Sequence, residues 1–206
     1  IYMMLKEEGY NCYLGGNIGT PLFAKIDDIT PEDIIVLELS SFQLMTLTQS
    51  PNIAVVTNVS PNHLDIHKSY EEYIEAKKNI FRFQNENDIV VLNYDNDITK
   101  DFAFESKGEV RFFSRKQELE KGVFVENNCI KILDENGKKD VINIDDILLL
   151  GMHNVENACT AIAAVKDLVS TEKIVKVLTT FKGVEHREEF VRELNGVKWY
   201  NDSIGS

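Results

Sequence analysis

The first half of the chain alternates short apolar runs with one long amphipathic stretch. Residues 33–40 (DIIVLELS), 52–60 (NIAVVTNVS) and 88–96 (DIVVLNYDN) are apolar almost without interruption, as expected for strands buried on both faces of a sheet. Residues 69–83 (SYEEYIEAKKNIFRF) fit a helix with Ser69 as its N-cap and acidic residues in its first turn. Buried strands that alternate with helices predict an α/β fold with a mostly parallel, doubly wound sheet flanked by helices.

The beginning of the chain also has a helical pattern. IYMMLKEEGY reads as the middle and end of a helix, with Gly9 as the C-cap. The next segment, NCYLGGNIGTPL, predicts a short strand that runs into a glycine-rich turn. A domain rarely begins inside a helix, and Ile1 is not an initiator residue. We therefore expect this sequence to be a piece of a longer protein.

The pattern changes after residue 108. Residues 109–114, 122–133 and 138–150 contain short apolar segments separated by turn pairs such as Asn127-Asn128 and Asn136-Gly137. They predict a small antiparallel β meander attached to the main sheet. Helical periodicity returns at residues 151–169 and 171–181. It stops near Lys182-Gly183, and residues 197–203 (VKWYNDS) resemble the first strand of a new domain. We expect a central domain over residues 1–182 and the start of a second domain over residues 183–206.

Composition excludes several classes of partner. The 206 residues carry a net charge of −12, from 34 acidic and 22 basic side chains, which argues against nucleic acid or an anionic membrane as a partner. No run approaches the about 20 apolar residues of a membrane-spanning helix. The three cysteines are widely spaced and form no CxxC pair, so we expect no disulfide framework or zinc site and a reducing, cytoplasmic location.

Polar residues follow two of the predicted strands. Glu38 and Ser40 end the first, and His63 and Asp65 follow the second. Ligands of open α/β sheets bind beyond the carboxyl ends of strands, where a carboxylate and an imidazole can share a hard divalent cation. The competing interpretation is that these residues only cap loops.

Three other segments hold candidate polar residues. Lys77 lies on the predicted helix 69–83, where a solvated helix face is the simplest interpretation. Asn17 lies in GGNIG, which permits close approach of a ligand to the backbone and also fits a plain turn. Asn154 and Asn157 share one face at the start of a helix, an end that favours negative charge; helix capping explains them equally well.

Seven segments in this order resemble the Mur ligase family over nearly the whole chain, and within it the D-glutamate-adding branch. The HNxxNxxAA helix is shared more widely, with other Mur ligases and folylpolyglutamate synthases, whereas ELSSFQL and the EHREEF and WYNDS pair point to that branch. The segments are GGNIG, ELSSFQL, TNVSPNHLDIH, YIEAKKNIF, GMHNVENACTAIAA, FKGVEHREEFV and GVKWYNDS.

The resemblance implies an ATP-binding central domain and a ligase reaction of peptidoglycan precursor synthesis. ATP and Mg²⁺ activate the carboxylate of UDP-N-acetylmuramoyl-L-alanine as an acyl phosphate. The amine of D-glutamate then attacks, which gives an amide, ADP and phosphate. Catalysis of this kind depends on positioning and on neutralising phosphate charge.

The resemblance also implies roles for individual residues. Glu38 and His63 resemble magnesium ligands, and Lys77 resembles a lysine that CO₂ carbamylates into an anion that can hold a second magnesium ion. Such a modification needs a neutral amine, which a buried lysine of lowered pKa supplies. The other implied contacts are with the UDP-sugar (Asn17, Ser40), ATP (Asn154, Asn157, Arg187, Asp202) and D-glutamate (Ser206).

The sequence departs from the family in two places. No G-x-x-x-x-G-K-[ST] phosphate loop occurs in these 206 residues, so we expect this chain alone to lack ligase activity and to bind nucleotide weakly at best. Ile204-Gly205-Ser206 stands where many members have Lys-Ala-Thr after NDS. Ile204 cannot supply the positive charge of that lysine, whereas Ser206 has a hydroxyl in place of the threonine's.

Three alternatives remain open on the sequence. In the first alternative, the parent protein is another Mur ligase or a folylpolyglutamate synthase. In the second, the chain is a noncatalytic domain that binds a nucleotide sugar. A metal-dependent hydrolase built on His63 and Asp65 is the third alternative, and it is weak because no second cluster of His and Asp residues is evident.

Overall fold

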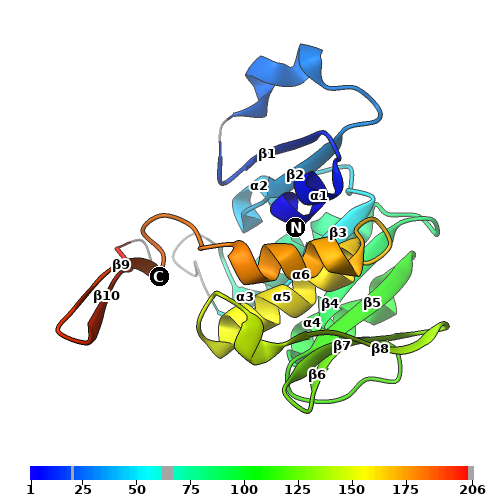
Figure 1. The fold of residues 1–206 in the computed structure, drawn as a ribbon. Coiled ribbons are helices and arrows are strands. Elements are labelled where there is room, and N and C mark those ends of the chain that lie inside the picture. Colours follow the sequence, from blue (N-terminus) through cyan, green and yellow to red (C-terminus); the bar gives the residue numbers. More distant parts are fainter. Residues whose placement is uncertain (20, 62–66, 204–206) are drawn as a thin grey trace.

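The computed structural model describes residues 1–19, 21–61 and 67–203. In this part of the chain the strands form a two-stranded parallel sheet, a six-stranded mixed sheet and an antiparallel hairpin (Figure 1). The first sheet pairs β1 (Cys12–Gly16) with β2 (Ile34–Glu38), and the hairpin pairs β9 (Glu189–Leu194) with β10 (Val197–Asn201). The six-stranded sheet has the order β3 (Ile53–Val56), β4 (Ile89–Asn93), β5 (Glu109–Ser114), β6 (Gly122–Glu126), β7 (Cys129–Asp134) and β8 (Gly137–Asn143).

Helices cover both faces of the six-stranded sheet. One face packs against the buried helix α5 (Met152–Val165), and α6 (Thr171–Thr180) lies over it in Figure 1. The helix α1 (Tyr2–Glu8) packs against α6 and β1. The opposite face is covered by α3 (Tyr70–Arg82), α4 (Asp97–Asp101) and a 3₁₀ turn, η2 (Phe102–Glu105). Helices on both faces of a largely parallel sheet confirm the predicted α/β class.

The helix α5 occupies the centre of the larger core. Eight of its residues are buried, and they face the sheet on one side and α6 on the other. A helix that is apolar on most of its circumference is buried in this way. The second core, below α3, contains the ring pair Phe81 and Phe102, whose centroids are 5.4 Å apart.

Two details of the sheet differ from the prediction. The sequence places residues 109–114 in the antiparallel meander, yet β5 runs parallel to both β4 and β6. A crossover through α4 and η2 makes β5 parallel to β4. Residues 144–150 form no strand in the structure, since residues 144–146 turn as a 3₁₀ helix, η3 (Ile144–Asp146). The remaining meander, β6-β7-β8, is antiparallel as predicted.

The predicted parallel strands also fall into two groups. Within the described residues, β2 pairs with β1 and β3 pairs with β4, and no hydrogen-bonded ladder joins β2 to β3. Apolar runs identify strands but do not say which strands are neighbours. One short helix, α2 (Ser41–Met45), follows β2, and a seven-residue 3₁₀ helix, η1 (Leu22–Asp28), lies between β1 and β2.

The three cysteines are free in the structure, with Cys12 and Cys159 buried. This agrees with the expectation of no disulfide framework. None of the helices in the described residues is long and apolar enough to cross a membrane.

Candidate functional site

The carboxyl end of β2 lies against the glycine-rich turn after β1. Gly16 and Glu38 are partners in the parallel ladder, and a Cβ on Gly16 would lie 2.2 Å from the Glu38 carbonyl oxygen. Asn17, the next residue, donates from its backbone N–H to that carbonyl at 2.7 Å and from Nδ2 to Glu38 Oε1 at 3.2 Å. The structure therefore brings together two residues that the sequence analysis had assigned to different ligands.

Ser40 begins the short helix α2. Its Oγ accepts a hydrogen bond from the backbone N–H of Gln43 at 3.3 Å, and the Gln43 side chain accepts from the Ser40 backbone N–H at 2.9 Å. This reciprocal pair is a capping box, and the SxxQ spacing in SSFQ is the signal that would have predicted α2. The Ser40 hydroxyl thus has a structural role in addition to the substrate contact predicted for it.

Lys77 and Lys78 are adjacent on α3 but have different surroundings. The Nζ atom of Lys78 lies 2.8 Å from Glu75 Oε1 and 2.6 Å from Glu105 Oε1. Lys77 is half-buried and, among the described residues, is part of no ion pair; its Nζ lies 5.6 Å from the centroid of the Tyr73 ring. Burial lowers the pKa of Lys77 below the ordinary lysine value, and the negative charge of Glu38 opposes this shift in part.

This environment favours the chemistry predicted for Lys77. An amine of lowered pKa has a larger neutral fraction near pH 7, and only the neutral form is a nucleophile. The charge of Glu38 acts on Lys77, so the two side chains are near enough to interact electrostatically. Lys78, held by two carboxylates, is suited to tying α3 to η2 instead.

Three of the predicted site residues lie outside the described residues: His63, Ser206 and, for the hydrolase alternative, Asp65. In residues 1–19, 21–61 and 67–203, no three or more His, Cys, Asp or Glu side chains form a group that could hold a metal. Glu38 supplies one hard oxygen donor of the type that Mg²⁺ prefers. The donor chemistry of Glu38, together with the half-buried amine of Lys77, fits a magnesium site that a carbamate would complete.

Four polar residues form a chain at the start of α5. Asn157 Nδ2 donates to Asn154 Oδ1 at 3.3 Å, and Asn154 Nδ2 donates to Leu150 O at 2.7 Å and to Glu188 Oε2 at 3.3 Å. The Glu188 backbone N–H donates to Asp202 Oδ1 at 3.1 Å. Three residues predicted to contact ATP are thus linked through Glu188, which the sequence analysis did not single out.

Arg187 lies beside this chain of contacts. Its backbone N–H donates to Val184 O at 3.2 Å, and its side chain is exposed. The flanking residues His186 and Glu188 have φ angles of 66° and 46°, so Arg187 is presented on a tightly turned segment. His153 Nε2 lies 3.0 Å from Glu188 Oε2, a second contact between this segment and α5.

Sequence reasoning also missed a buried amide at the ends of the parallel strands. Asn93, the last residue of β4, donates from Nδ2 to Thr57 O after β3 at 2.8 Å and to Glu156 Oε1 on α5 at 3.1 Å. It is only 2% exposed. A polar residue closing the run IVVLN was the available signal, but its partners are 36 and 63 residues away in the chain.

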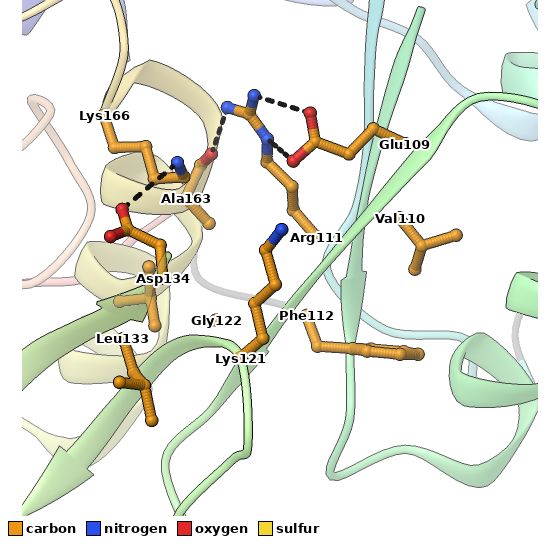
Figure 2. A pocket seen from close by; sticks show the side chains of 11 residues that line it. Glu109, Val110, Arg111, Phe112, Lys121, Gly122, Leu133, Asp134, Ala163 and Lys166 are labelled. Atoms are coloured by element: carbon orange, nitrogen blue, oxygen red, sulfur yellow. Dashed lines mark hydrogen bonds and ion pairs between the residues drawn. The ribbon is translucent and has the colours of Figure 1, made fainter. Parts of the chain in front are cut away.

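A separate cavity of about 100 Å³ opens between β5, β6, β7 and α5 (Figure 2). Its charged side chains are already paired: Arg111 donates from Nε and Nη2 to Glu109 at 3.0 Å each, and Lys166 Nζ lies 3.7 Å from Asp134. Glu109 and Gly122 begin their strands, so this cavity is at the amino ends of β5 and β6. Ligands of parallel sheets bind at the opposite ends, and we do not assign the cavity to the candidate site.

Comparison with known proteins decides the family. A family profile described as "Mur ligase middle domain" matches residues 1–165. The chain belongs to the Mur ligase family. Similar relatives from Acetivibrio thermocellus, Ruminiclostridium cellulolyticum and Clostridium kluyveri are 60%, 56% and 54% identical over 206 residues, and each is named UDP-N-acetylmuramoylalanine--D-glutamate ligase.

Solved structures agree on the fold of this Mur ligase chain. MurF from Acinetobacter baumannii has a TM-score of 0.69 at 20% identity, covering 98% of this chain and 47% of that one. A UDP-N-acetylmuramoyl-L-alanyl-D-glutamate--2,6-diaminopimelate ligase has a TM-score of 0.73 at 20% identity, covering 93% and 45%. The alignments with the named relatives cover all 206 residues of this chain but only 44% of the length of each relative. The resemblance to the family and the predicted fold class are therefore confirmed.

Proposed function

We propose that this chain contributes the middle domain of an ATP-dependent ligase that joins D-glutamate to UDP-N-acetylmuramoyl-L-alanine through an acyl phosphate. The observation that carries the proposal is the 60% identity, over the whole chain, to a relative named for the ligation of UDP-N-acetylmuramoylalanine and D-glutamate. The names of the relatives favour this reaction over another Mur ligase or a folylpolyglutamate synthase. Such a reaction in peptidoglycan precursor synthesis would take place in the bacterial cytoplasm.

The metal side of the proposed site consists of Glu38, His63 and Lys77. When bound, Mg²⁺ neutralises charge on the phosphate oxygens of ATP and of the acyl phosphate. Asn17 keeps the Glu38 carboxylate in place through its hydrogen bond to Oε1. The Lys77 ammonium first loses one proton to solvent. The neutral Nζ then attacks the carbon of CO₂: an N–C bond forms, one C=O π electron pair moves onto oxygen, and a second proton leaves Nζ to solvent. A carbamate anion thereby replaces an ammonium cation.

The nucleotide side of the proposed site lies at the start of α5 and in the segment after Gly183. Asn154 and Asn157 present side-chain amides there, and the amino end of a helix favours negative charge. Arg187 is suited to bind a phosphate oxygen pair through its planar guanidinium group. The proposal also includes the ligand contacts that the family resemblance predicts for Asp202, Asn17, Ser40 and Ser206. It includes the predicted domain boundary at residues 182 and 183 as well.

A chimera tests the proposal. The matching segment of the Acetivibrio thermocellus relative is replaced by this chain, and phosphate release and amide formation are measured with UDP-N-acetylmuramoyl-L-alanine, D-glutamate and Mg·ATP. We expect ligation that depends on all three substrates. Glu38→Ala and Lys77→Ala should each abolish it, whereas Lys78→Ala is the matched control because Lys78 is committed to Glu75 and Glu105.

The outcomes separate the competing functions. A folded chimera that binds the nucleotide sugar but turns over no ATP would support the noncatalytic alternative. Loss of activity in Lys78→Ala equal to that in Lys77→Ala would contradict the assignment of Lys77. The amino-acid preference itself is tested in the longer protein with its natural flanking sequence, by comparing D-glutamate with other amino acids.

A further inference from the structure

His67 is a buried histidine next to the proposed site, and nothing so far has given it a role. It is 3% exposed, and its Nε2 lies 2.9 Å from the Oγ of Ser41, which is 2% exposed. Ser41 is the first residue of α2 and lies three residues after Glu38. The hydrogen bond therefore joins the segment after β3 to the segment that carries Glu38.

The imidazole ring of His67 also contacts two aromatic rings. It stacks on Phe42 with centroids 5.2 Å apart and planes 9° apart, and it meets Tyr73 edge to face at 5.3 Å and 75°. Tyr73 is one helical turn before Lys77 on α3, and its ring lies 5.6 Å below Lys77 Nζ. Contacts thus run continuously from Ser41 through His67 and Tyr73 to Lys77.

The second nitrogen of His67 makes this arrangement costly. Nδ1 is buried and has no hydrogen-bond partner in the part of the chain that the structure describes. An unsatisfied buried nitrogen is unfavourable, and phenylalanine at this position would keep the ring contacts without that penalty. Packing alone therefore does not explain a histidine here, whereas its hydrogen bond to Ser41 does.

We infer that His67 is a positioning residue, which sets the separation between Glu38 and Lys77 by tying α2 to α3 through Ser41 and Tyr73. The inference rests on the proposed metal site and deepens it. Replacing a residue that orients a metal ligand without itself binding the metal typically lowers metal affinity about 10- to 100-fold. In this inference His67 acts through Ser41 and Tyr73, which its ring contacts.

The decisive variant is the double substitution Ser41→Ala/His67→Phe. It removes both partners of the hydrogen bond and keeps an aromatic ring against Phe42 and Tyr73, so the fold should retain its melting temperature or gain slightly. In the chimera described above we expect the Kd for Mn²⁺, measured by electron paramagnetic resonance, to rise at least about tenfold. His67→Gln, whose amide can still reach Ser41, should recover part of that loss.

Ser50→Ala is the matched control. Ser50 Oγ donates to Asn79 O and accepts from the Phe83 backbone N–H, both at 3.0 Å, and so it anchors the other end of α3. This substitution should lower the melting temperature and leave the Kd for Mn²⁺ within twofold of the unchanged chimera. The contrast between the two variants separates positioning from general stability.

Two results would overturn the inference alone. One is an unchanged Kd for Mn²⁺ in Ser41→Ala/His67→Phe while Glu38→Ala abolishes binding. The other is a loss of affinity that follows the melting temperature equally in the double variant and in Ser50→Ala. If Glu38→Ala and Lys77→Ala both bind Mn²⁺ as well as the unchanged chimera, the proposed metal site fails and the inference fails with it.

Discussion

Asn17 donates two hydrogen bonds to Glu38, one from its backbone N–H to the carbonyl at 2.7 Å and one from Nδ2 to Oε1 at 3.2 Å. The first bond fixes the course of the two parallel strands, and the second orients the carboxylate. A side-chain substitution removes only the second. The two contributions of Asn17 can therefore be separated by experiment.

Asn17→Ala should have a small effect on stability and a large effect on function. Both side chains are exposed, so the free energy of unfolding, measured with urea, should fall by no more than about 1 kcal/mol. Activity of the chimera should fall at least tenfold, because the Glu38 carboxylate loses its fixed orientation. Asn11→Ala is the control: Asn11 Nδ2 donates to Asp33 Oδ1 at 2.7 Å at the opposite end of the same strand pair. Equal activity losses in the two variants would contradict the prediction.

Gly16→Ala should destabilise the chain more than Gly137→Ala. Both glycines have positive φ, 95° and 102°, so alanine is strained at either position by about 1 kcal/mol. Only at Gly16 would the new Cβ meet an atom within 4 Å, the Glu38 carbonyl oxygen at 2.2 Å. We expect urea unfolding to show an additional loss of about 1–3 kcal/mol for Gly16→Ala. Equal losses would show that the strands separate there at little cost.

Glu126 should make stability depend on pH in acid. A hydrogen bond from Lys138, with contributions from Glu118 and Lys131, lowers the pKa of Glu126 from 4.5 to about 2. The unfolded chain therefore binds more protons than the folded chain between these values, and stability falls as pH decreases from 4.5 to 2. Above pH 4.5 the contribution is fully present.

The test compares urea unfolding of the natural chain and Glu126→Gln from pH 7 to pH 2.5. The difference in unfolding free energy between the two should shrink as the pH falls through this window. In Lys138→Met the carboxyl carbon of Glu126 should titrate at a higher pH by NMR, because its first hydrogen-bond donor is gone. A pH-independent difference between the chains would rule out this account.

Glu188→Gln should tighten nucleotide binding. The Glu188 carboxylate contacts His153 and Asn154 at the amino end of α5, the end at which an anionic ligand is favoured. Removing that negative charge should lower the Kd for ATP by up to about fivefold, equivalent to ~1 kcal/mol. Calorimetry on the chimera measures this Kd, with Glu193→Gln in the neighbouring strand β9 as the control. Weaker binding in Glu188→Gln would instead make the carboxylate part of the nucleotide site.

The parts of this structure that were predictable have local causes. The continuous apolar runs identified β2, β3 and β4 as strands. Burial on both faces, the expected reason for these runs, describes β4, whereas Ile35 and Leu37 of β2 are 45% and 50% exposed. The turn at Asn127 and Asn128 was readable because both residues adopt positive φ, 52° and 60°, which asparagine tolerates well. The same locality explains the confirmed ends of α1 and α3.

The unpredicted parts depend on residues far apart in the chain. The direction of β5 follows from a crossover that the apolar pattern does not reveal, and the partition of the strands into two sheets depends on neighbours. Ser41 and His67 are 26 residues apart, and no local pattern indicates that they pair. Lys77 could be separated from Lys78 only once the positions of Glu75 and Glu105 were known.

The capping box of α2 has an evolutionary consequence. If the Ser40 hydroxyl both caps the amino end of α2 and contacts a substrate, one mutation removes two properties on which selection acts, helix stability and substrate binding. Threonine keeps a hydroxyl and caps helices, whereas alanine at a cap costs about 0.5–2 kcal/mol of stability. Fewer residue types are therefore expected at position 40 than at a residue with a single role. Exchange between serine and threonine should be the most frequent natural substitution there.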